Sequence, residues 1–154
     1  GTLSGIWLAA QAGAPAHDVA SVEAVAGEGL AEDRYRDHTG TFSARGGAGR
    51  EVTLIAQEAL DALARDHQLT LTPQMARRNL VTLGVPLNDL VGREFWVGEV
   101  LLRGVRLCEP CQTLAESSGL GAPLIQALLH RGGLRADIVR GGLIQTGDRI
   151  HPLG

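Results

Sequence analysis

The chain has 154 residues, of which 44% are hydrophobic and 20% charged, so we expect one globular domain over residues 1–154. Its net charge of −3 argues against general nucleic-acid binding, which needs a basic surface. No apolar run reaches the roughly 20 residues that cross a bilayer, and no basic start precedes an apolar stretch. We therefore predict a cytoplasmic protein that binds neither nucleic acid nor a membrane.

The first half of the chain alternates short strands with turns and helices. In chain order we predict a strand at Val19–Val25 ended by a glycine turn, a long polar loop at Glu32–Arg50, a strand at Val52–Ile55, an amphipathic helix at Gln57–His67, a short helix from Pro73 and a strand at Arg78–Leu83. Loops as long as the one at Glu32–Arg50 are usually functional or disordered.

The second half is richer in strands. We predict a hairpin of Glu94–Val97 and Val100–Val105 around Gly98-Glu99, a short helix at Pro123–His130, and closing strands at Arg135–Val139 and Gly142–Ile150. Twenty-one glycines and only 3% aromatic residues are typical of short strands joined by tight turns. Too few crossover helices are visible for a doubly wound α/β sheet. The pattern favours a mainly β fold, a closed or partly closed β-barrel with a few short α-helices.

The only two cysteines form a Cys108-Glu109-Pro110-Cys111 motif between a strand and a turn of helix. A disulfide between them would close too small a loop to stabilise a fold of this length. Two adjacent thiols in a chain that needs no disulfide fit a reducing compartment. Four interpretations stay open: a thioredoxin-like redox pair, a structural zinc site that includes His130, two inert buried thiols, or one soft thiolate for a transition metal.

Several arginines accompany glycine turns in this acidic chain. Arg77-Arg78-Asn79 is either an anion site with bidentate arginine forks or a solvated basic patch. His130-Arg131-Gly132-Gly133-Leu134-Arg135 is either a ligand-binding turn or a glycine helix cap with exposed arginines. Asp33-Arg34 is either a loop-bracing ion pair or a further anion contact. Together these motifs suggest a phosphate-bearing ligand with a metal or an electrophile at its other end.

In their order along the chain, these motifs resemble the MOSC family, which is named for the C-terminal domain of molybdenum cofactor sulfurase. The matching segments are Val22–Val25, Gly29-Leu30, Asp33-Arg34, Val52–Ile55, Glu58–Leu60, Arg78–Thr82, Gly84–Gly92, Gly98–Val100, Leu107–Cys111, His130–Arg135 and Gly147-Asp148. The resemblance covers nearly the whole chain from about Val19 onward, and the ordered set is more specific than any single motif.

The resemblance implies a small MOSC-type β-barrel that binds molybdenum cofactor in a cleft. Cys111 matches the cysteine that ligates molybdenum in relatives that reduce N-hydroxylated compounds. The cofactor contacts it implies are Arg34, Arg77, Arg78, Asn79, Arg131, Gly132, Gly133 and Arg135. His130 is then either a proton donor or a structural hydrogen-bonder.

The resemblance also implies partners: a small-molecule substrate and an electron-donor protein, because no flavin or ferredoxin domain is visible. We expect an oxotransferase or reductase of N-hydroxylated compounds. The alternatives are a non-enzymatic carrier of molybdenum cofactor or metal-bound sulfur, and a structural barrel whose cofactor site has decayed. Tyr35 stands where many relatives carry histidine, which argues against a catalytic role for that position.

Overall fold

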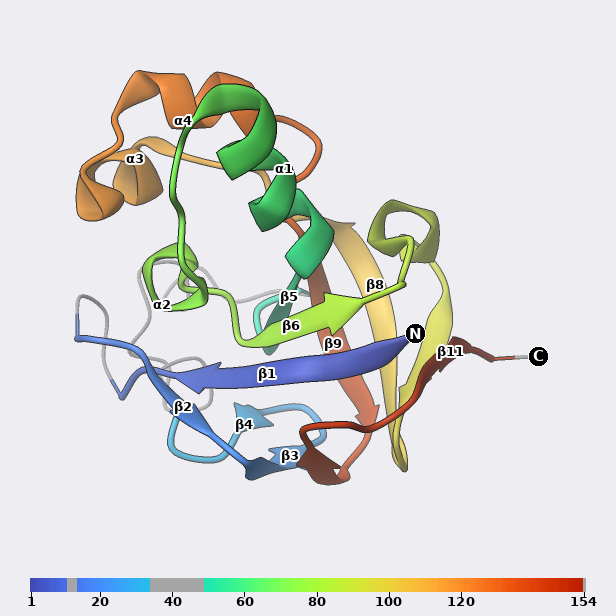
Figure 1. Cartoon of the computed structure of the whole chain (residues 1–154). Helices are drawn as coiled ribbons and strands as arrows, with labels where there is room; N and C mark the ends of the chain where they lie inside the picture. Colours follow the sequence, from blue (N-terminus) through green and yellow to red (C-terminus); the bar gives the residue numbers. More distant parts are fainter. Residues whose placement is uncertain (11–13, 34–48, 154) are drawn as a thin grey trace.

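The computed structural model of the chain describes residues 1–10, 14–33 and 49–153, and within them β-strands predominate over short helices (Figure 1). The strands are β1 (Thr2–Leu8), β2 (His17–Val19), β3 (Ser21–Val25), β4 (Gly29–Leu30), β5 (Val52–Ala56), β6 (Leu80–Leu83), β7 (Glu94–Val97), β8 (Val100–Leu107), β9 (Leu134–Arg140), β10 (Gly142–Gln145) and β11 (Ile150–Pro152). The helices are α1 (Gln57–His67), α2 (Pro73–Ala76), α3 (Gln112–Ser118) and α4 (Ala122–Ala127), with a 3-10 turn η2 at Leu87–Leu90. The predicted mainly β class with short helices is confirmed.

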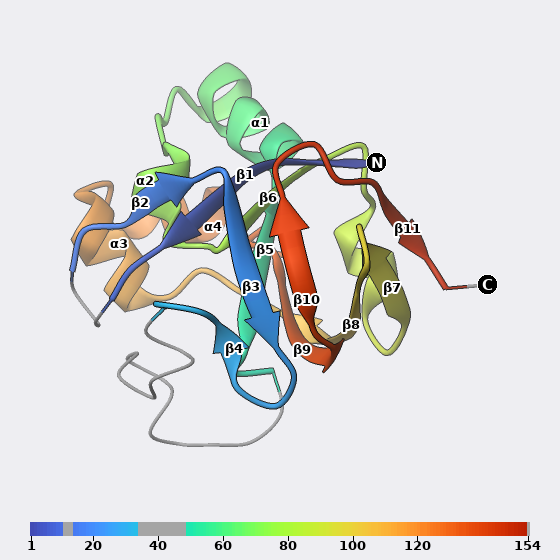
Figure 2. The same cartoon turned by 90° about the horizontal axis from the view of Figure 1, so that it is seen from below.

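The strands form two sheets. One has the order β11-β7-β8-β9-β5-β6-β1-β2, and the other has the order β10-β3-β4, seen from below in Figure 2. Only the β5–β6 pair is parallel among these ladders, and α1 and α2 connect its strands. All the other pairs are antiparallel, as expected where short turns join neighbours.

The large sheet curls, but no sheet of the described residues closes into a barrel, so the predicted barrel is not confirmed. Leu3 N donates to Asp148 O at 2.9 Å, and Ile150 N donates to Gly1 O at 2.8 Å. A single bridge, Thr2 to Arg149, accompanies these bonds. Because β1 meets mainly the turn before β11 rather than β11 itself, no continuous ladder joins the two.

Apolar side chains cover both faces of the large sheet because successive strand residues point to opposite sides. Leu54 and Leu80 belong to the main cluster, which lies between the two sheets with Val22 and Ile144. On the other face, Ile55 and Val81 belong to a second cluster, which the helices cover with Leu60, Leu63, Leu114, Leu124 and Leu128. Figure 1 shows these helices together above the sheet.

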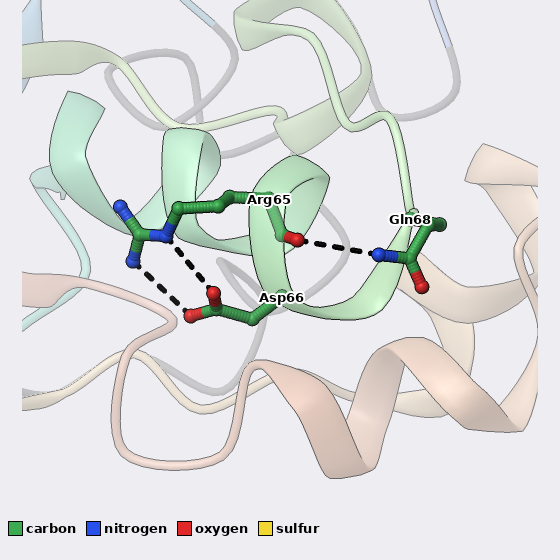
Figure 3. Close-up of polar contacts among 3 residues, drawn as sticks. All are labelled: Arg65, Asp66 and Gln68. Carbon is green, nitrogen blue, oxygen red and sulfur yellow. Dashed lines mark hydrogen bonds and ion pairs between the residues drawn. The ribbon is translucent and has the colours of Figure 1, made fainter.

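Helix α1 begins and ends where the sequence predicts. Its apolar face buries Leu60 and Leu63, and the chain leaves it through Gln68, whose φ of 53° is left-handed. Figure 3 shows this end, where Gln68 Nε2 donates to Arg65 O at 3.2 Å. Arg65 Nε also lies 2.9 Å from Asp66 Oδ1, and the hydrogen bond from Arg65 lowers the pKa of Asp66. An ion pair this exposed contributes little to stability.

Other boundaries differ from the prediction for local reasons. The expected strand Val19–Val25 is divided between β2 and β3, and Gly142–Ile150 is divided between β10 and β11 by a turn in which Asp148 Oδ2 accepts from Gln145 N at 2.8 Å. The helix expected at Pro123–His130 spans Ala122–Ala127. Strand β1 was not predicted at all. None of the helices in the described part of the chain is both long and apolar enough to cross a membrane.

Candidate functional site

Two segments that the sequence singled out, Cys108–Cys111 and His130–Arg135, pack directly against each other. The amide of Cys108 donates to the carbonyl oxygen of Gly133 at 2.7 Å. Gly132 is buried, and a side chain there would collide with the carbonyl oxygen of Cys108. Gly133 has a φ of 110°, in the region that favours glycine. The close packing of Gly132 explains how the cysteine motif can lie against the turn before β9, whereas Gly133 lets the same turn pack against Leu54 of β5.

Arg78 fastens the same two segments from inside the protein. Its side chain is nearly buried, with 9% exposure, and it donates to three backbone carbonyls. Nε lies 2.9 Å from Gly132 O, Nη2 lies 3.2 Å from Cys108 O, and Nη1 lies 3.2 Å from Ala76 O. The sequence suggests that Arg78 contacts a ligand phosphate, but the bonds described here all go to the protein.

Asn79 and Arg77 also bind their own backbone surroundings. The fully buried Asn79 Oδ1 accepts from the amide and the hydroxyl of Thr53 at 3.0 and 3.2 Å, and Nδ2 donates to Trp7 O at 3.1 Å. Asn79 therefore joins β5 and β1 just before β6 begins. Arg77 ends α2 with a left-handed φ of 57°, and its Nη1 donates to Ala14 O at 2.6 Å.

His130 is held at both its backbone and its ring. Its amide donates to Glu109 Oε1 at 2.8 Å, and its Nδ1 lies 2.9 Å from Glu109 Oε2. Its carbonyl accepts from Asn88 Nδ2 at 2.8 Å, and its φ is 60°. These contacts favour the structural role for His130 over proton donation. With Arg131 and Gly133 it lines a hollow of about 250 Å³ whose other walls include Glu58, Asn88 and Leu87.

Arg135 is not among the residues that line this hollow. It lies on the sheet face that also carries the Thr53 side chain. In the strand register Arg135 stands opposite Thr53 on β5 and opposite Arg106 on β8, so the three side chains form a row across three strands. Each guanidinium group of the row is a planar fork of N–H donors, the geometry that suits carboxylate and phosphate groups. Sequence reasoning missed Arg106 because its place depends on the β8–β9 register, which shifts between Gly104 and Arg106.

A pair of carboxyl groups lies on the same face, two residues along β9 from Arg135. Asp137 is 7% exposed; its Oδ1 accepts from Gly49 N at 2.7 Å, and its Oδ2 lies 3.7 Å from Arg103 Nη2. Glu51 Oε1 accepts from Gly27 N at 3.1 Å and Ile138 N at 3.0 Å. Burial, together with the repulsion and hydrogen bonding of Asp137, raises the pKa of Glu51 above 4.5.

This raised pKa gives a testable dependence of stability on pH. The folded state binds the Glu51 proton more tightly than the unfolded chain does, so this group stabilises the fold below about pH 4.5, and the contribution is lost as pH rises through the folded pKa. A Glu51→Gln variant keeps the acceptor oxygen and removes the charge, so it should be more stable than the native chain at pH 7, with a smaller difference at pH 4. Urea unfolding at pH 4 and pH 7 measures the pH dependence of the native chain and the effect of the substitution. If the stability of the native chain relative to Glu51→Gln instead increased with pH, the raised pKa of Glu51 would be refuted.

The two cysteines differ in accessibility. Cys108 is 2% exposed, whereas Cys111 is half-buried and packs at the edge of the second apolar cluster, immediately before α3. Both thiols are free. Only Cys111 of the pair is therefore placed to reach a ligand without movement of the backbone.

The remaining predictions concern Arg34, Tyr35 and a zinc site. Arg34 and Tyr35 lie outside the described residues. Among the residues that the structure describes, no group of three or more histidine, cysteine, aspartate or glutamate side chains could hold a metal ion. This lends no support to a zinc site built from the two cysteines and His130, whose ring nitrogen Nδ1 already faces Glu109.

Comparison with known proteins gives a family and a fold. A family model described as MOSC domain matches residues 41–151. The YUAD protein from Bacillus subtilis superposes with a TM-score of 0.82 at 16% identity, over 97% of this chain and 93% of that one. YiiM from Escherichia coli gives 0.68 at 16% identity, over 100% of this chain and 70% of that one.

YiiM from Geobacillus stearothermophilus gives a TM-score of 0.61 at 20% identity, over 71% of this chain and 57% of that one. At these identities the structural likeness concerns the fold alone. No curated protein matches the chain.

Proposed function

The chain belongs to the MOSC domain family, and on this premise we propose that it binds molybdenum cofactor with the Cys111 thiolate as a metal ligand. The observation that carries the proposal is the difference between the two thiols, since Cys111 is accessible at the start of α3 and Cys108 is buried. A soft thiolate is a suitable ligand for a transition metal. The cofactor, when bound, supplies a centre for two-electron redox chemistry.

The remaining donors fit a phosphate-bearing group. Arg106 and Arg135 stand opposite each other where β8 ends and β9 begins, and the cysteine motif leaves the same end of β8. Planar guanidinium forks bind phosphate oxygens in pairs. We assign the phosphate contact to these two arginines, with Arg34 and Arg131 as further expected contacts. Arg78, Asn79 and Gly132 then act behind them as framework, given their bonds and packing within the protein.

The reaction we propose is the reduction of an N-hydroxylated small molecule. The N–O bond breaks and two electrons and two protons are consumed, so that an N–H product and water are formed. The electrons come from a separate electron-donor protein. His130 stays a candidate proton donor, although its bonds to Glu109 favour a role in holding the turn. We also propose that the curled sheet works as a partly closed barrel, supported by the bonds of Leu3 and Ile150 across its gap.

Metal content tests the proposal directly. The protein is produced with cofactor supplied, and molybdenum and pterin are measured in the native chain, in Cys111→Ala and in the matched control Cys108→Ala. We expect near-stoichiometric molybdenum in the native chain and in folded Cys108→Ala, and at least a tenfold loss in Cys111→Ala. Equal molybdenum in both variants would refute the ligand assignment and favour a decayed cysteine site. No molybdenum in the native protein would refute the cofactor itself.

A second measurement separates an enzyme from a carrier. Both functions need the same site, so metal content does not distinguish them. The loaded native protein is given reduced viologen as an artificial electron donor and an N-hydroxylated substrate such as benzamidoxime. Turnover that disappears in Cys111→Ala supports the reductase, whereas a loaded protein without turnover favours the carrier of cofactor or metal-bound sulfur.

A further inference from the structure

A second hollow is lined by residues of β1, β2 and β6 and by the first residues of α1 and α2. Figure 1 shows β1 and β6 below these helices. The hollow has a volume of about 430 Å³, within the range of small-molecule pockets. It is lined by Ser4, Gly5, Ile6, Trp7, Asp18, Val19, Ala20, Gln57, Pro73, Val81 and Thr146. Apart from the backbone carbonyl of Trp7, which accepts from Asn79 Nδ2, these residues are not part of the site described above, so the hollow needs its own explanation.

Trp7 and Asp18 form the chemical centre of this hollow. They stand opposite each other in the β1–β2 ladder, so the half-buried indole and the exposed carboxylate project from the same face. Gly5, two residues before Trp7, leaves the space that the ring occupies: a Cβ at Gly5 would lie 3.3 Å from Trp7 Nε1. The missing side chain lets the indole lie back along β1.

The charge of the lining selects a cation. Asp18 carries the only formal charge among the lining residues. A second carboxylate, Asp61, stands just behind the wall, where its Oδ1 accepts from Gln57 Nε2 at 3.0 Å. A cation beside an indole face gains from the ring quadrupole in addition to the carboxylate.

The hydrogen-bonding groups of the lining also favour a cationic ligand. Ser4 Oγ donates its single proton to Val81 O at 3.1 Å, so towards a ligand this hydroxyl is an acceptor. The Gln57 side-chain amide donates from Nε2 to Asp61, so the other polar atom of this amide is its carbonyl oxygen, a hydrogen-bond acceptor. With Asp18 these groups prefer a ligand that donates several hydrogen bonds. The apolar wall of Ile6, Val19, Pro73 and Val81 suits an uncharged body.

We propose that this hollow is a binding site for an organic cation, an amidinium or guanidinium group on a small apolar body, held between Trp7 and Asp18. The cation stacks on the indole, and its N–H groups donate to Asp18 and to the acceptors on β1 and α1. The group belongs either to a free small molecule or to an arginine side chain of a partner. The site does not depend on the cofactor proposal.

The test follows the fluorescence of Trp7 in a Trp96→Phe background, where Trp7 is the only tryptophan. The probe is benzamidinium, with benzamide as its neutral counterpart and N-acetylarginine amide as the model of a partner's side chain. We expect a saturable change with benzamidinium or with N-acetylarginine amide, and none with benzamide over the same concentrations. The tighter of the two cations identifies the source.

Two matched variants decide the role of the carboxylate. Asp18→Asn and Glu23→Gln each remove one exposed negative charge, but only Asp18 lines the hollow. We expect Asp18→Asn to weaken cation binding at least tenfold, or about 1.4 kcal/mol, and Glu23→Gln to leave it unchanged. Because both side chains are exposed, both variants should keep the native melting temperature. Equal affinity for benzamide and benzamidinium, or equal effects of the two variants, would overturn the proposal.

Discussion

A Gly133→Ala variant is expected to be destabilised by about 3–5 kcal/mol, enough to unfold a domain of marginal stability. Two penalties add. The native φ of 110° strains any residue that has a Cβ, and that Cβ would collide with the carbonyl oxygen of Leu54 in β5. The neighbouring backbone belongs to the central sheet and has little freedom to move. Chemical unfolding followed by circular dichroism measures the loss.

Gly27→Ala is the matched control. Gly27 also has a left-handed φ, of 78°, but no atom lies within 4 Å of the Cβ position. This variant should therefore lose only about 1 kcal/mol, the conformational part of the penalty. If the two variants lost the same stability, the close contact between the turn before β9 and β5 would not be the cause.

An Arg78→Met variant is expected to lose about 3–5 kcal/mol, because methionine fills a similar space and leaves three carbonyl oxygens without their donor. The acceptors are Ala76, Cys108 and Gly132, which belong to three segments remote in sequence. Since two of them flank the proposed metal ligand, the variant should also expose the cysteine motif. The rate at which an alkylating reagent labels the thiols under native conditions reports this exposure.

Arg78→Lys tests whether geometry or charge is responsible. A lysine keeps the positive charge but has one nitrogen in place of a planar fork, so it should recover little of the stability. Arg65→Met is the control for removing an arginine in general, because Arg65 is exposed and bonds to Asp66 alone among its described side-chain partners. We expect no measurable change in Arg65→Met. Full recovery in Arg78→Lys would show that the site needs only the charge.

The elements that sequence could predict are those whose signals are local. The spacing of Leu60 and Leu63 gives α1 its bounds, and Gly98-Glu99 marks the β7–β8 hairpin. Strand β1 gave no such signal because its register shifts between Leu3 and Gly5, which breaks the alternation of apolar residues. The gap that keeps the sheet open is equally invisible, since it depends on which contacts residues 1–3 make with residues 147–150.

For the candidate site, the sequence singles out segments that the structure brings together, but it does not reveal what their side chains contact. The pairing of the cysteine motif with the glycine turn was suggested, and the structure brings the two together. The pattern around Arg78 cannot reveal whether a guanidinium faces a ligand or a buried carbonyl, because both uses need the same fork. Arg106 and the Glu51–Asp137 pair had no local signal, since strand register alone brings them to the site.

The position of β1 has a consequence for how the chain folds. This strand is synthesised long before Asp148, the residue to which its Leu3 amide donates, and Gly1 likewise precedes its partner Ile150. These backbone hydrogen bonds cannot form until residues 147–150 have left the ribosome. Such sequence-distant pairing slows folding, because the entropy of closing a long loop is lost before the contacts compensate for it. Until then the apolar residues of β1 are exposed in a nascent chain, where they are open to chaperones and to aggregation.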